Sequence, residues 1–248
     1  MRYLLLSDIH SNLEALEACL KAAEGRYEQI ACLGDLVGYG PDPNAVVEIL
    51  RPAAPATIRG NHDRVCSGPA PAADFNPVAR LAVAWTKAEL TPEHSRFLRA
   101  LPAGPLQLEG FQIVHGSPMD EDEYLVGLAD ASPLLKGAES QTVCFGHTHI
   151  QGGFLRTARG RIESIRLPPG QDGLLLELRL EKEYRYLVNP GSVGQPRDGD
   201  PRAAFAIHDT EQQVVEYFRV SYDLPKTQKK MRQAGLPQVL RERLSYGR

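Results

Sequence analysis

The sequence predicts an α/β protein in which two packed β-sheets are flanked by helices. This prediction rests on two different patterns of strands and helices in two parts of the chain. Up to residue 60, short apolar strands alternate with amphipathic helices, which is the order of a mostly parallel sheet covered by helices. From about residue 151 to 220, strands follow one another with tight turns between them. This second pattern favours another, more antiparallel sheet packed on the first.

The first elements are a buried strand and a helix. Residues 2–7 (RYLLLS) are apolar enough for a strand that is buried on both faces. Asn12 is suited to cap the next helix, in which Leu13, Leu16 and Leu20 fall on one side. The following elements are a strand at 28–33, a helix from Pro43 to about Leu50, and a short strand at 56–59.

The middle of the chain is expected to hold a surface excursion, two helices and a hairpin. Residues 68–77 are rich in Pro, Ala and Gly, which indicates the excursion. Two helices follow, and Thr91 with Pro92 is suited to the start of the second. The predicted hairpin strands are Leu106–Leu108 and Phe111–Val114 around Glu109-Gly110, and residues 142–145 form a further strand.

The last part of the chain is expected to contain strands and then a helical tail. An arginine-bearing segment, 156–166, is interpreted as a solvated hairpin, with a surface for an anionic substrate or a partner as the alternative. Residues 224–248 are predicted to be helical, with a break at Gly235-Leu236-Pro237. We therefore expect a main domain over 1–220 and a C-terminal helical extension over 221–248 packed on it. The strands expected here are 174–180, 184–188, 203–208 and 214–220.

Composition is typical of a globular protein with a substantial core. The chain has 248 residues, of which 42% are hydrophobic and 24% are charged. Its net charge of −3 gives no basis for non-specific binding to nucleic acid or membranes. The N-terminus is interpreted as a strand, too short for a signal peptide or a membrane span. Reduced, buried thiols are expected because no CxxC pair occurs, which favours a cytoplasmic protein; the cysteines are Cys19, Cys32, Cys66 and Cys144.

Residues of the metal-ligand type follow the predicted strands at the points where the strands end. In open α/β sheets, sites form beyond the carboxyl ends of the strands, so we expect these segments to converge. One such segment alone would be interpreted as a turn, but five of them together indicate a metal site. The segments are Asp8-Ile9-His10, Gly34-Asp35, Gly60-Asn61-His62-Asp63, His115-Gly116 and Gly146-His147-Thr148-His149.

The spacing within two of these segments suggests how they face the site. Asp8 and His10 are two residues apart, as are His147 and His149, and such side chains point the same way while the chain is extended. We therefore expect each pair to face one cluster of ions. Carboxylate, imidazole and amide ligands suit Mn²⁺, Fe, Zn²⁺ or Ni²⁺ in a catalytic site. The lack of cysteine among them argues against a structural zinc site.

The series D-x-H, G-D, G-N-H-D, H-G and G-H-T-H resembles the calcineurin-like metallophosphoesterase superfamily. It is most similar to the small bacterial and archaeal phosphodiesterase-like members. The motifs span residues 8–149, and the stretch NPGSVGQPR at 189–197 also resembles a family feature. The resemblance implies a four-layer sandwich of two packed mixed β-sheets flanked by helices. It also implies phosphoester hydrolysis with two divalent metal ions.

The resemblance implies a role for each motif residue. Asp35 would bridge both metal ions, since two cations about 4 Å apart repel and need a carboxylate between them. His62 would lie near the scissile phosphate without binding metal, and would protonate the leaving oxygen or stabilise the transition state. A structural histidine is the alternative for His62, and Asp63 is expected to cap the turn. The first metal ion would be bound by Asp8, His10 and His149, and the second by Asn61, His115 and His147.

One departure from the superfamily concerns the phosphate contacts. In its phosphoprotein phosphatases an acid and an arginine follow the G-D motif, whereas here the segment 36–40 (LVGYG) follows. This makes a serine/threonine protein phosphatase a weaker alternative. Arg197, in the Gly/Pro-rich loop 189–199, is suited to bidentate phosphate contacts. The full set of candidate substrate contacts is Asn12, Tyr39, Arg59 and Arg197, with a surface or turn role as the alternative for each.

The resemblance therefore implies a dinuclear enzyme that uses metal-activated hydroxide on small phosphodiesters or phosphomonoesters, nucleotides included. Mn²⁺ is the expected metal, with Fe, Zn²⁺ or Ni²⁺ as alternatives. A binding scaffold on the same fold is the alternative from another class, and the complete set of ligand positions argues against it. No basic groove or row of stacking aromatics for a long nucleic acid is seen. A small phosphoester is the expected partner, without a membrane, and the tail is a possible homo-oligomer contact.

Overall fold

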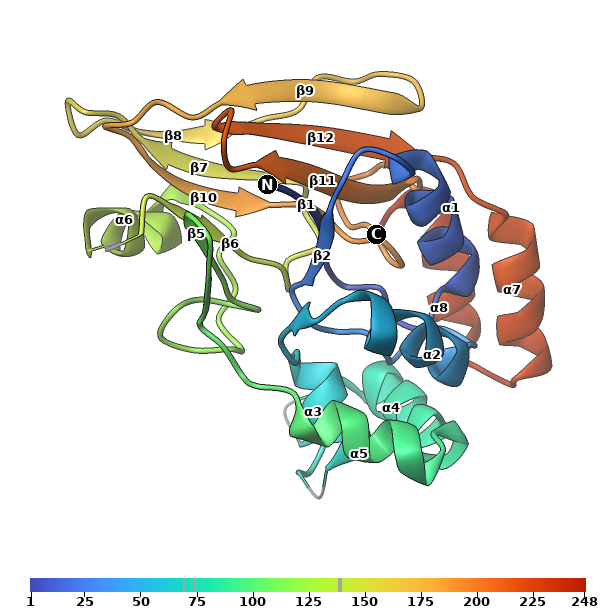
Figure 1. The fold of residues 1–248 in the computed structure, drawn as a ribbon. Coiled ribbons are helices and arrows are strands. Elements are labelled where there is room, and N and C mark those ends of the chain that lie inside the picture. Colours follow the sequence, from blue (N-terminus) through green and yellow to red (C-terminus); the bar gives the residue numbers. More distant parts are fainter. Residues whose placement is uncertain (69, 74, 138–139) are drawn as a thin grey trace.

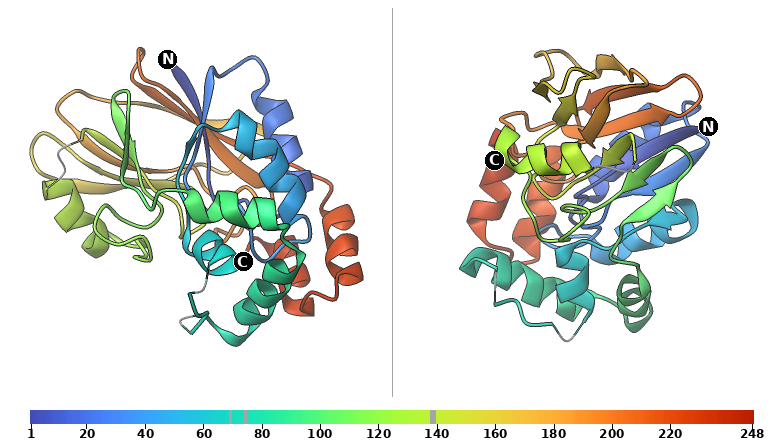
Figure 2. Two further views of the ribbon diagram at one scale, coloured as in Figure 1. Left: turned by 60° about the horizontal axis from the view of Figure 1, so that its bottom comes forward. Right: turned by 90° about the vertical axis from the view of Figure 1, so that its left-hand side faces the viewer.

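The computed structural model describes residues 1–68, 70–73, 75–137 and 140–248, and its two six-stranded sheets pack face to face (Figure 1). Helices cover the outer face of each sheet. Figure 2 (left) shows the strands between helix α6 on one side and helices α1 and α2 on the other. The predicted four-layer α/β architecture is therefore confirmed.

The first sheet has the order β3-β2-β1-β11-β12-β9. Strand β1 runs parallel to β2, with Leu5 opposite Ala31, and antiparallel to β11. The sheet is thus parallel at its N-terminal edge and antiparallel beyond β1. Its strands are β1 (Arg2–Leu6), β2 (Gln29–Cys32), β3 (Ala56–Thr57), β9 (Gly173–Arg179), β11 (Ala203–Asp209) and β12 (Val214–Val220).

The second sheet has the order β4-β5-β6-β10-β7-β8. The hairpin predicted around Glu109-Gly110 is present as β4 and β5, and β7 with β8 forms the hairpin expected at 156–166. The strands are β4 (Leu106–Leu108), β5 (Phe111–Ile113), β6 (Thr142–Cys144), β7 (Gly152–Arg156), β8 (Ile162–Ile165) and β10 (Arg185–Asn189).

The expectation that the late strands form a sheet of their own was wrong. Strands β9, β11 and β12 extend the first sheet, whereas β7, β8 and β10 belong to the second. Both sheets are therefore mixed. In each sheet the strands from the first half of the chain leave one edge unpaired. Strands from the second half of the chain continue the sheet at that edge and satisfy its backbone hydrogen bonds.

The helices begin at the predicted signals. Asn12 caps α1 by accepting a hydrogen bond from the backbone of Ala15, and Thr91 caps α5 by accepting one from His94. Helices α3 and α6 were not predicted, and α6 holds Pro133 within its span. The helices are α1 (Leu13–Ala23), α2 (Pro43–Ala53), α3 (Asn61–Ser67), α4 (Pro77–Glu89), α5 (Pro92–Ala100), α6 (Leu128–Gly137), α7 (Leu224–Gln233), α8 (Gln238–Arg243) and the 3₁₀ helix η1 (Leu244–Tyr246).

Apolar side chains fill each interface between layers. Leu5, Phe111 and Tyr217 are fully buried between the two sheets. Leu16 belongs to the cluster under α1, and Leu135 to the cluster under α6. The strands that carry the polar segments are thus embedded in core on both faces, which fixes where their ends lie.

The C-terminal extension packs on α1 and α4 (Figure 1). Its helices α7 and α8 are separated at the predicted break, residues 235–237. The buried carboxylate of Glu14 in α1 forms ion pairs with Lys226 at 3.1 Å and with Lys230 at 2.6 Å. These contacts join the tail to the main domain, while the boundary near residue 220 stays a prediction.

Two further sequence expectations concern thiols and membranes. All four cysteines are buried free thiols, as predicted. Among the described residues, none of the helices has the length and apolar character that crossing a membrane requires.

Candidate metal centre

The polar segments converge at one end of the sheets. Every histidine and carboxylate predicted as a metal ligand falls into one of three groups whose ligand atoms lie within 4.8 Å of one another. Asn61, the predicted amide ligand, lies beside them, with its Oδ1 3.3 Å from His115 Nε2. The groups are Asp8 with His10 and His149, Asp35 with His115 and His147, and His10 with Asp35 and His62.

The backbone at these segments is left-handed, and the expectation of extended pairs was wrong. Eight non-glycine residues of the described chain have positive φ, and all but Gln213 belong to these polar segments or the loops between them. Each such residue costs about 1–2 kcal/mol, and such strain concentrates at functional sites. The seven are Asp8, His10, Ser11, Asp35, Tyr39, His147 and His149.

Hydrogen bonds between the segments hold this strained backbone in place. The Asp35 carbonyl accepts hydrogen bonds from the backbone of Ile9 and His10, at 2.9 and 3.0 Å. The Asp8 carboxylate accepts one from the backbone of His147 at 3.1 Å and another from the Ser7 hydroxyl at 2.7 Å. Because the buried polar groups find their partners in neighbouring segments, the segments fold as one unit.

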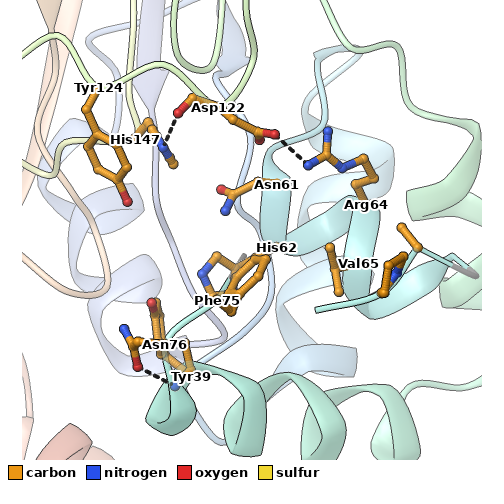
Figure 3. Close-up of a pocket in the computed structure, with 13 residues that line it drawn as sticks. Tyr39, Asn61, His62, Arg64, Val65, Phe75, Asn76, Asp122, Tyr124 and His147 are labelled. Carbon is orange, nitrogen blue, oxygen red and sulfur yellow. Dashed lines mark hydrogen bonds and ion pairs between the residues drawn. The ribbon is translucent and has the colours of Figure 1, made fainter. Parts of the chain in front are cut away.

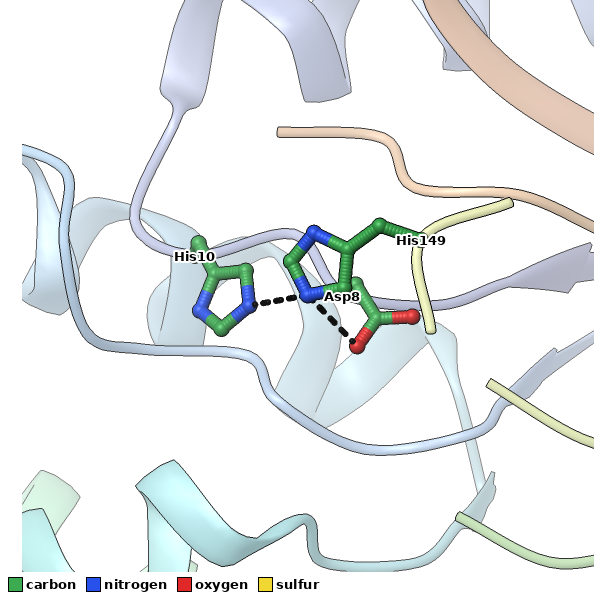
Figure 4. A group of neighbouring side chains, drawn as sticks. All are labelled: Asp8, His10 and His149. Carbon is green, nitrogen blue, oxygen red and sulfur yellow. Dashed lines mark hydrogen bonds and ion pairs between the residues drawn. The ribbon is translucent and has the colours of Figure 1, made fainter. Parts of the chain in front are cut away.

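The first half of the centre consists of Asp8, His10 and His149 (Figure 4). His149 Nε2 lies 3.1 Å from His10 Nε2 and 3.4 Å from Asp8 Oδ1. Nδ1 of His10 faces the Val37 carbonyl at 3.1 Å, and Nδ1 of His149 faces the Gln195 carbonyl at 2.6 Å. These carbonyls accept the Nδ1 protons, so both Nε2 lone pairs point at the cluster, which is the usual arrangement of metal-binding histidines.

The second half consists of Asn61, His115 and His147. His115 Nδ1 faces the Leu33 carbonyl at 2.8 Å, which leaves its Nε2 for the cluster. His147 is turned the other way, because its Nε2 lies 3.2 Å from the Asp122 carbonyl (Figure 3). The nitrogen of His147 that is left with a free lone pair is therefore Nδ1.

Asp35 stands between the two halves. Its Oδ2 lies 3.6 Å from His10 Nε2 in the first half and 3.4 Å from His115 Nε2 in the second. Its Oδ1 accepts a hydrogen bond from the backbone of His62 at 2.9 Å. A carboxylate in this position can contact two cations at once, as the family resemblance implies for Asp35.

Burial and charge act in opposite directions on the ionisable groups. Burial holds the pKa values of His10 and His149 well below the ordinary value and lowers that of His147 to about 3. Burial opposes protonation of His115 too, but the facing Asp35 carboxylate outweighs it and raises the pKa of His115 to about 10. The second half thus contains an ion pair whose proton a metal ion would have to displace.

Asp63 secures the loop that departs from the phosphoprotein phosphatases. Its carboxylate accepts hydrogen bonds from the backbone of Leu36 at 3.2 Å, Val37 at 3.0 Å and Gly60 at 3.0 Å. The expected structural role of Asp63 therefore extends beyond its own turn. Gly38, with φ of +97°, is required in this loop because a Cβ there would lie 2.5 Å from His62 Nδ1.

His62 lines a cavity of about 470 Å³ beside the centre (Figure 3). Its ring lies against Tyr39 and Phe75, with centroids 4.4 and 4.7 Å away. Its Nδ1 is buried against Gly38 and has no hydrogen-bond partner among the described residues. Proximity also groups His62 with His10 and Asp35, so its assignment as a residue that does not bind metal stays a prediction from the resemblance.

The four candidate substrate contacts divide into two kinds. Asn12 caps α1 and donates to the Gly194 carbonyl at 2.9 Å, and Arg59 donates twice to Glu121 at 3.2 Å. Both side chains are therefore already engaged within the fold, and a substrate contact by either one stays a prediction. Tyr39 lies against His62 and lines the cavity, and the Arg197 guanidinium lies 5.9 Å from the centroid of the Tyr39 ring.

Other residues of the site were not anticipated. Phe75 and Tyr124 form walls of the cavity, and the Tyr124 ring lies 3.9 Å from that of His147. Arg64 pairs with Asp122 at 2.7 Å and thereby holds the segment whose carbonyl contacts His147. Arg64 directly follows the G-N-H-D motif, which is a signal that could have found it. Phe75 and Tyr124 lie outside the predicted ligand segments, and no local pattern in the sequence marks them.

A family model described as the calcineurin-like phosphoesterase superfamily domain matches residues 1–213. The chain belongs to the calcineurin-like phosphoesterase superfamily. The resemblance in the strand-end motifs is thereby confirmed. An uncharacterized protein of Methanocaldococcus jannaschii is 36% identical over 250 residues, which covers 98% of this chain and 97% of that relative.

Solved structures agree with this membership in the superfamily. A metallophosphoesterase from Sphaerobacter thermophilus has a TM-score of 0.85 and 39% identity, covering 100% of this chain and 99% of its own. A hypothetical protein from Pyrococcus horikoshii OT3 has a TM-score of 0.78 and covers 100% of this chain and 98% of its own. At 21% identity, this second likeness concerns the fold alone.

The donor set fits the divalent metal ions that the calcineurin-like phosphoesterase superfamily implies. Three of the four imidazoles carry their proton toward a backbone carbonyl and offer Nε2 to the cluster, and the fourth, His147, offers Nδ1. Together with the buried Asp8 and Asp35 carboxylates and the Asn61 amide, they form a mixed nitrogen and oxygen set. Such a set suits a first-row transition metal without selecting one.

Proposed function

We propose that the protein is a dinuclear metal-dependent phosphoesterase that hydrolyses small phosphodiesters or phosphomonoesters. The observation that carries this proposal is the position of the Asp35 carboxylate. Its Oδ2 lies within 3.6 Å of a histidine from each half of the centre, and the cavity that contains His62 opens beside it. A buried carboxylate shared by two ligand groups supports two cations held close together.

Two divalent cations bound here would neutralise charge on the phosphoryl oxygens and lower the pKa of a water molecule so that hydroxide is supplied at neutral pH. The chain's own residues set the rest of the reaction. Asp8, His10 and His149 would hold one cation, and Asn61, His115 and His147 the other. Tyr39 and Phe75 enclose His62 and keep bulk water from its ring.

His62 is the residue proposed to act on the leaving group. Burial lowers its pKa to about 4, so the imidazole is neutral near pH 7 and carries one N–H donor. Its Nδ1 is buried against Gly38, whose lack of a side chain lets the ring pack beside the loop 36–40. A phosphate anion next to the ring would favour the protonated form, which would assist departure of the leaving oxygen.

The test is hydrolysis by the Mn²⁺-loaded protein of bis-p-nitrophenyl phosphate, p-nitrophenyl phosphate, cyclic nucleotides, dinucleoside polyphosphates and phosphopeptides. We expect turnover of at least one small ester, its loss with a chelator, and its recovery when Mn²⁺ is restored. His62→Ala should lower kcat by about a hundredfold to ten-thousandfold while both metal ions remain bound.

His94→Ala is the matched control, since His94 lies on α5 and contacts Glu48 and Asn44 instead of the centre. It should keep the wild-type kcat. Metal-loaded, folded protein that cleaves none of these esters would overturn the proposed function. Full activity in His62→Ala would overturn only the role assigned to His62.

A further inference from the structure

The cavity beside the metal centre offers more room than a phosphoryl group needs. It has a volume of about 470 Å³, and both His62 and His147 line it (Figure 3). This volume is typical of pockets that enclose a whole small molecule. A phosphate held at the centre would fill only the end of the cavity next to these two histidines. The rest of the space is therefore available to the substituent on the phosphate, which is the alcohol part of the ester.

Two aromatic side chains form walls of this cavity, and each contacts one of the two histidines. The Tyr124 ring is 51% exposed and lies on the His147 ring, with the centroids 3.9 Å apart and the planes 35° apart. The half-buried Phe75 ring packs against the apolar core and meets the His62 ring at an interplanar angle of 85°. A ligand that extends from the centre into the cavity therefore meets aromatic side chains next to both histidines.

The other described residues of the lining give the cavity little net charge. Arg64 and Asp122 are the charged residues among them, and they pair with each other at 2.7 Å, while Arg64 also pairs with Glu121. A second phosphate or a carboxylate on the substrate would therefore find no free cation in the described lining. A neutral group would find apolar contacts, because the lining also includes Val65, Ala70, Pro71 and Ala79.

A planar aromatic ring gains most from walls of this kind, since it can lie against an aromatic side chain with its whole face while it buries apolar surface. We propose that the cavity binds a neutral, planar aromatic substituent of the substrate, and that Tyr124 and Phe75 determine this specificity. The inference rests on the proposed function, because it names the class of small phosphoester that the centre would hydrolyse. This class comprises esters of an aryl alcohol and esters of a nucleoside.

Asn76, another residue of the lining, distinguishes these two kinds of ester. Its Oδ1 caps helix α4 by accepting a hydrogen bond from the Ala79 backbone at 2.9 Å. Its amide nitrogen makes no hydrogen bond within the described structure, so it can donate one to an acceptor on the edge of a nucleobase. A phenyl ring offers no such acceptor. Asn76→Ser keeps a capping oxygen but removes the amide donor, so it should weaken a nucleoside ligand alone.

The test measures binding of phosphonates to the Mn²⁺-loaded protein by calorimetry, because their carbon–phosphorus bond resists hydrolysis. Methylphosphonate reports on the metal centre alone. Phenylphosphonate should bind about tenfold more tightly, and cyclohexylphosphonate, which has apolar surface without a planar face, should fall between the two. Para-carboxyphenylphosphonate should bind more weakly than phenylphosphonate, because its carboxylate meets no free cation in the described lining. Tighter binding of this second anion would overturn the preference for a neutral group.

The decisive variants are Tyr124→Leu and Phe75→Leu, which keep an apolar side chain but remove the aromatic face. Each should weaken phenylphosphonate about threefold to tenfold and leave methylphosphonate within about twofold of wild type. An equal loss for both phosphonates would mean that these side chains support the metal ions, and it would overturn their role in specificity. Thermal unfolding shows whether the packing of Phe75→Leu survives. Because Tyr124 is exposed, Tyr124→Leu tests the proposal even if Phe75→Leu does not fold.

The matched control is Tyr246→Leu, which removes the same kind of ring from η1. Tyr246 is 65% exposed and lies outside the lining of the cavity. This variant should bind methylphosphonate and phenylphosphonate as wild type does. A loss of phenylphosphonate affinity as large as that of Tyr124→Leu would contradict the assignment of specificity to the cavity.

The methylenephosphonate analogue of adenosine monophosphate separates a nucleobase from a simple aryl group. If Asn76→Ser weakens this analogue about threefold to tenfold and leaves phenylphosphonate unchanged, the planar group is a nucleobase. If Asn76→Ser changes neither ligand and the analogue binds no more tightly than phenylphosphonate, the group is a simple aryl ring.

The proposal is overturned if wild type binds phenylphosphonate no more tightly than methylphosphonate, or if both leucine variants keep the full preference. Because binding is measured without turnover, this result is separate from the test of the proposed function. A preference for phenylphosphonate in a protein that cleaves no ester would remove the phosphoesterase function and leave the ligand class of the cavity. Cleavage of esters without that preference would leave the function and remove the specificity.

Discussion

The two halves of the candidate metal centre are held by different parts of the molecule. In the first half, Asp8, His10 and His149 are at most 1% exposed, and both imidazoles are oriented by carbonyls of well-buried loops. In the second half, Asn61 is half-buried and His147 lines the cavity. His147 is oriented by the Asp122 carbonyl, which belongs to a segment at the protein surface.

That surface segment is secured by ion pairs between side chains. Arg64 pairs with Asp122, and the two side chains are 30% and 44% exposed. Such exposed pairs contribute about 0–1 kcal/mol, far less than a buried hydrogen-bonded core. We therefore expect the first half to bind its metal ion tightly and the second half to exchange its ion, with Asp35 coupling the two.

The largest expected effect comes from removing the coupling residue. Asp35→Asn keeps the shape of the side chain but removes the charge that both halves share, so activity should fall by about a thousandfold or more. The measurement is kcat with Mn²⁺ on the best ester, together with the number of ions bound per chain. Asp209→Asn, at the surface pair with Arg2, is the control and should retain activity. Two ions bound with unchanged kcat would show that Asp35 does not couple the halves.

Next in size is the contrast between the two halves themselves. His149→Ala should weaken the tighter Mn²⁺ site about a hundredfold, whereas His147→Ala should weaken the looser site and leave the tighter one within about threefold. Equilibrium titration with Mn²⁺, read by calorimetry or electron paramagnetic resonance, gives both constants. If both variants weaken the same site equally, the separation into two halves is wrong.

A smaller effect is expected from loosening the surface segment. Arg64→Gln removes the pair with Asp122, so the looser Mn²⁺ site should weaken about threefold to tenfold. The effect should diminish as salt is raised, because salt already screens an exposed pair. Arg51→Gln breaks a surface pair with Glu93 far from the centre and should change neither site. Weakening of the tighter site by Arg64→Gln would contradict the assignment.

The smallest effect is expected from replacing His208, a buried histidine outside the ligand groups, because this change should affect stability and leave the site unchanged. It packs on Phe111 between the sheets, and neither ring nitrogen has a partner among the described residues. Burial lowers its pKa from 6.5 to about 4, so the unfolded chain takes up the proton first as pH falls. The stability contribution is present above pH 6.5 and is lost as pH falls toward about 4.

His208→Leu removes this proton uptake. In metal-free protein, urea unfolding at about pH 7.5 and about pH 5 should show that the variant loses about 2 kcal/mol less free energy of unfolding than wild type between these values. Its metal binding and activity should stay unchanged. An identical pH dependence in both proteins would show that burial does not disfavour the charged form of His208.

The strand-end positions of the ligands could be predicted from the sequence, because a buried apolar run followed by Asp or His marks where a strand leaves the sheet. The backbone conformation of these residues could not be predicted in this way. Asp8 and His147 are left-handed, with φ of 52° and 64°. No local preference of Asp or His selects that conformation over an extended one, and only the hydrogen bonds between segments stabilise it.

The walls of the cavity could not be predicted from local sequence patterns either. Phe75 and Tyr124 belong to none of the predicted ligand segments, and only the folded chain brings them beside His62 and His147. Asn12 and Arg59 have the right chemistry and lie near the motifs in sequence. Their partners, Gly194 and Glu121, are nevertheless distant, so only the folded chain shows that these side chains are already engaged.

The sequence by itself determined the α/β class, the candidate ligand residues and the family, because strand periodicity and short motifs are local properties of the chain. The tertiary structure decided how the late strands divide between two mixed sheets, which nitrogen of each histidine faces the centre, and that the tail meets Tyr39 and the loop 189–199. These features are stabilised by contacts between residues far apart in the chain. The sequence of any single segment therefore does not reveal them.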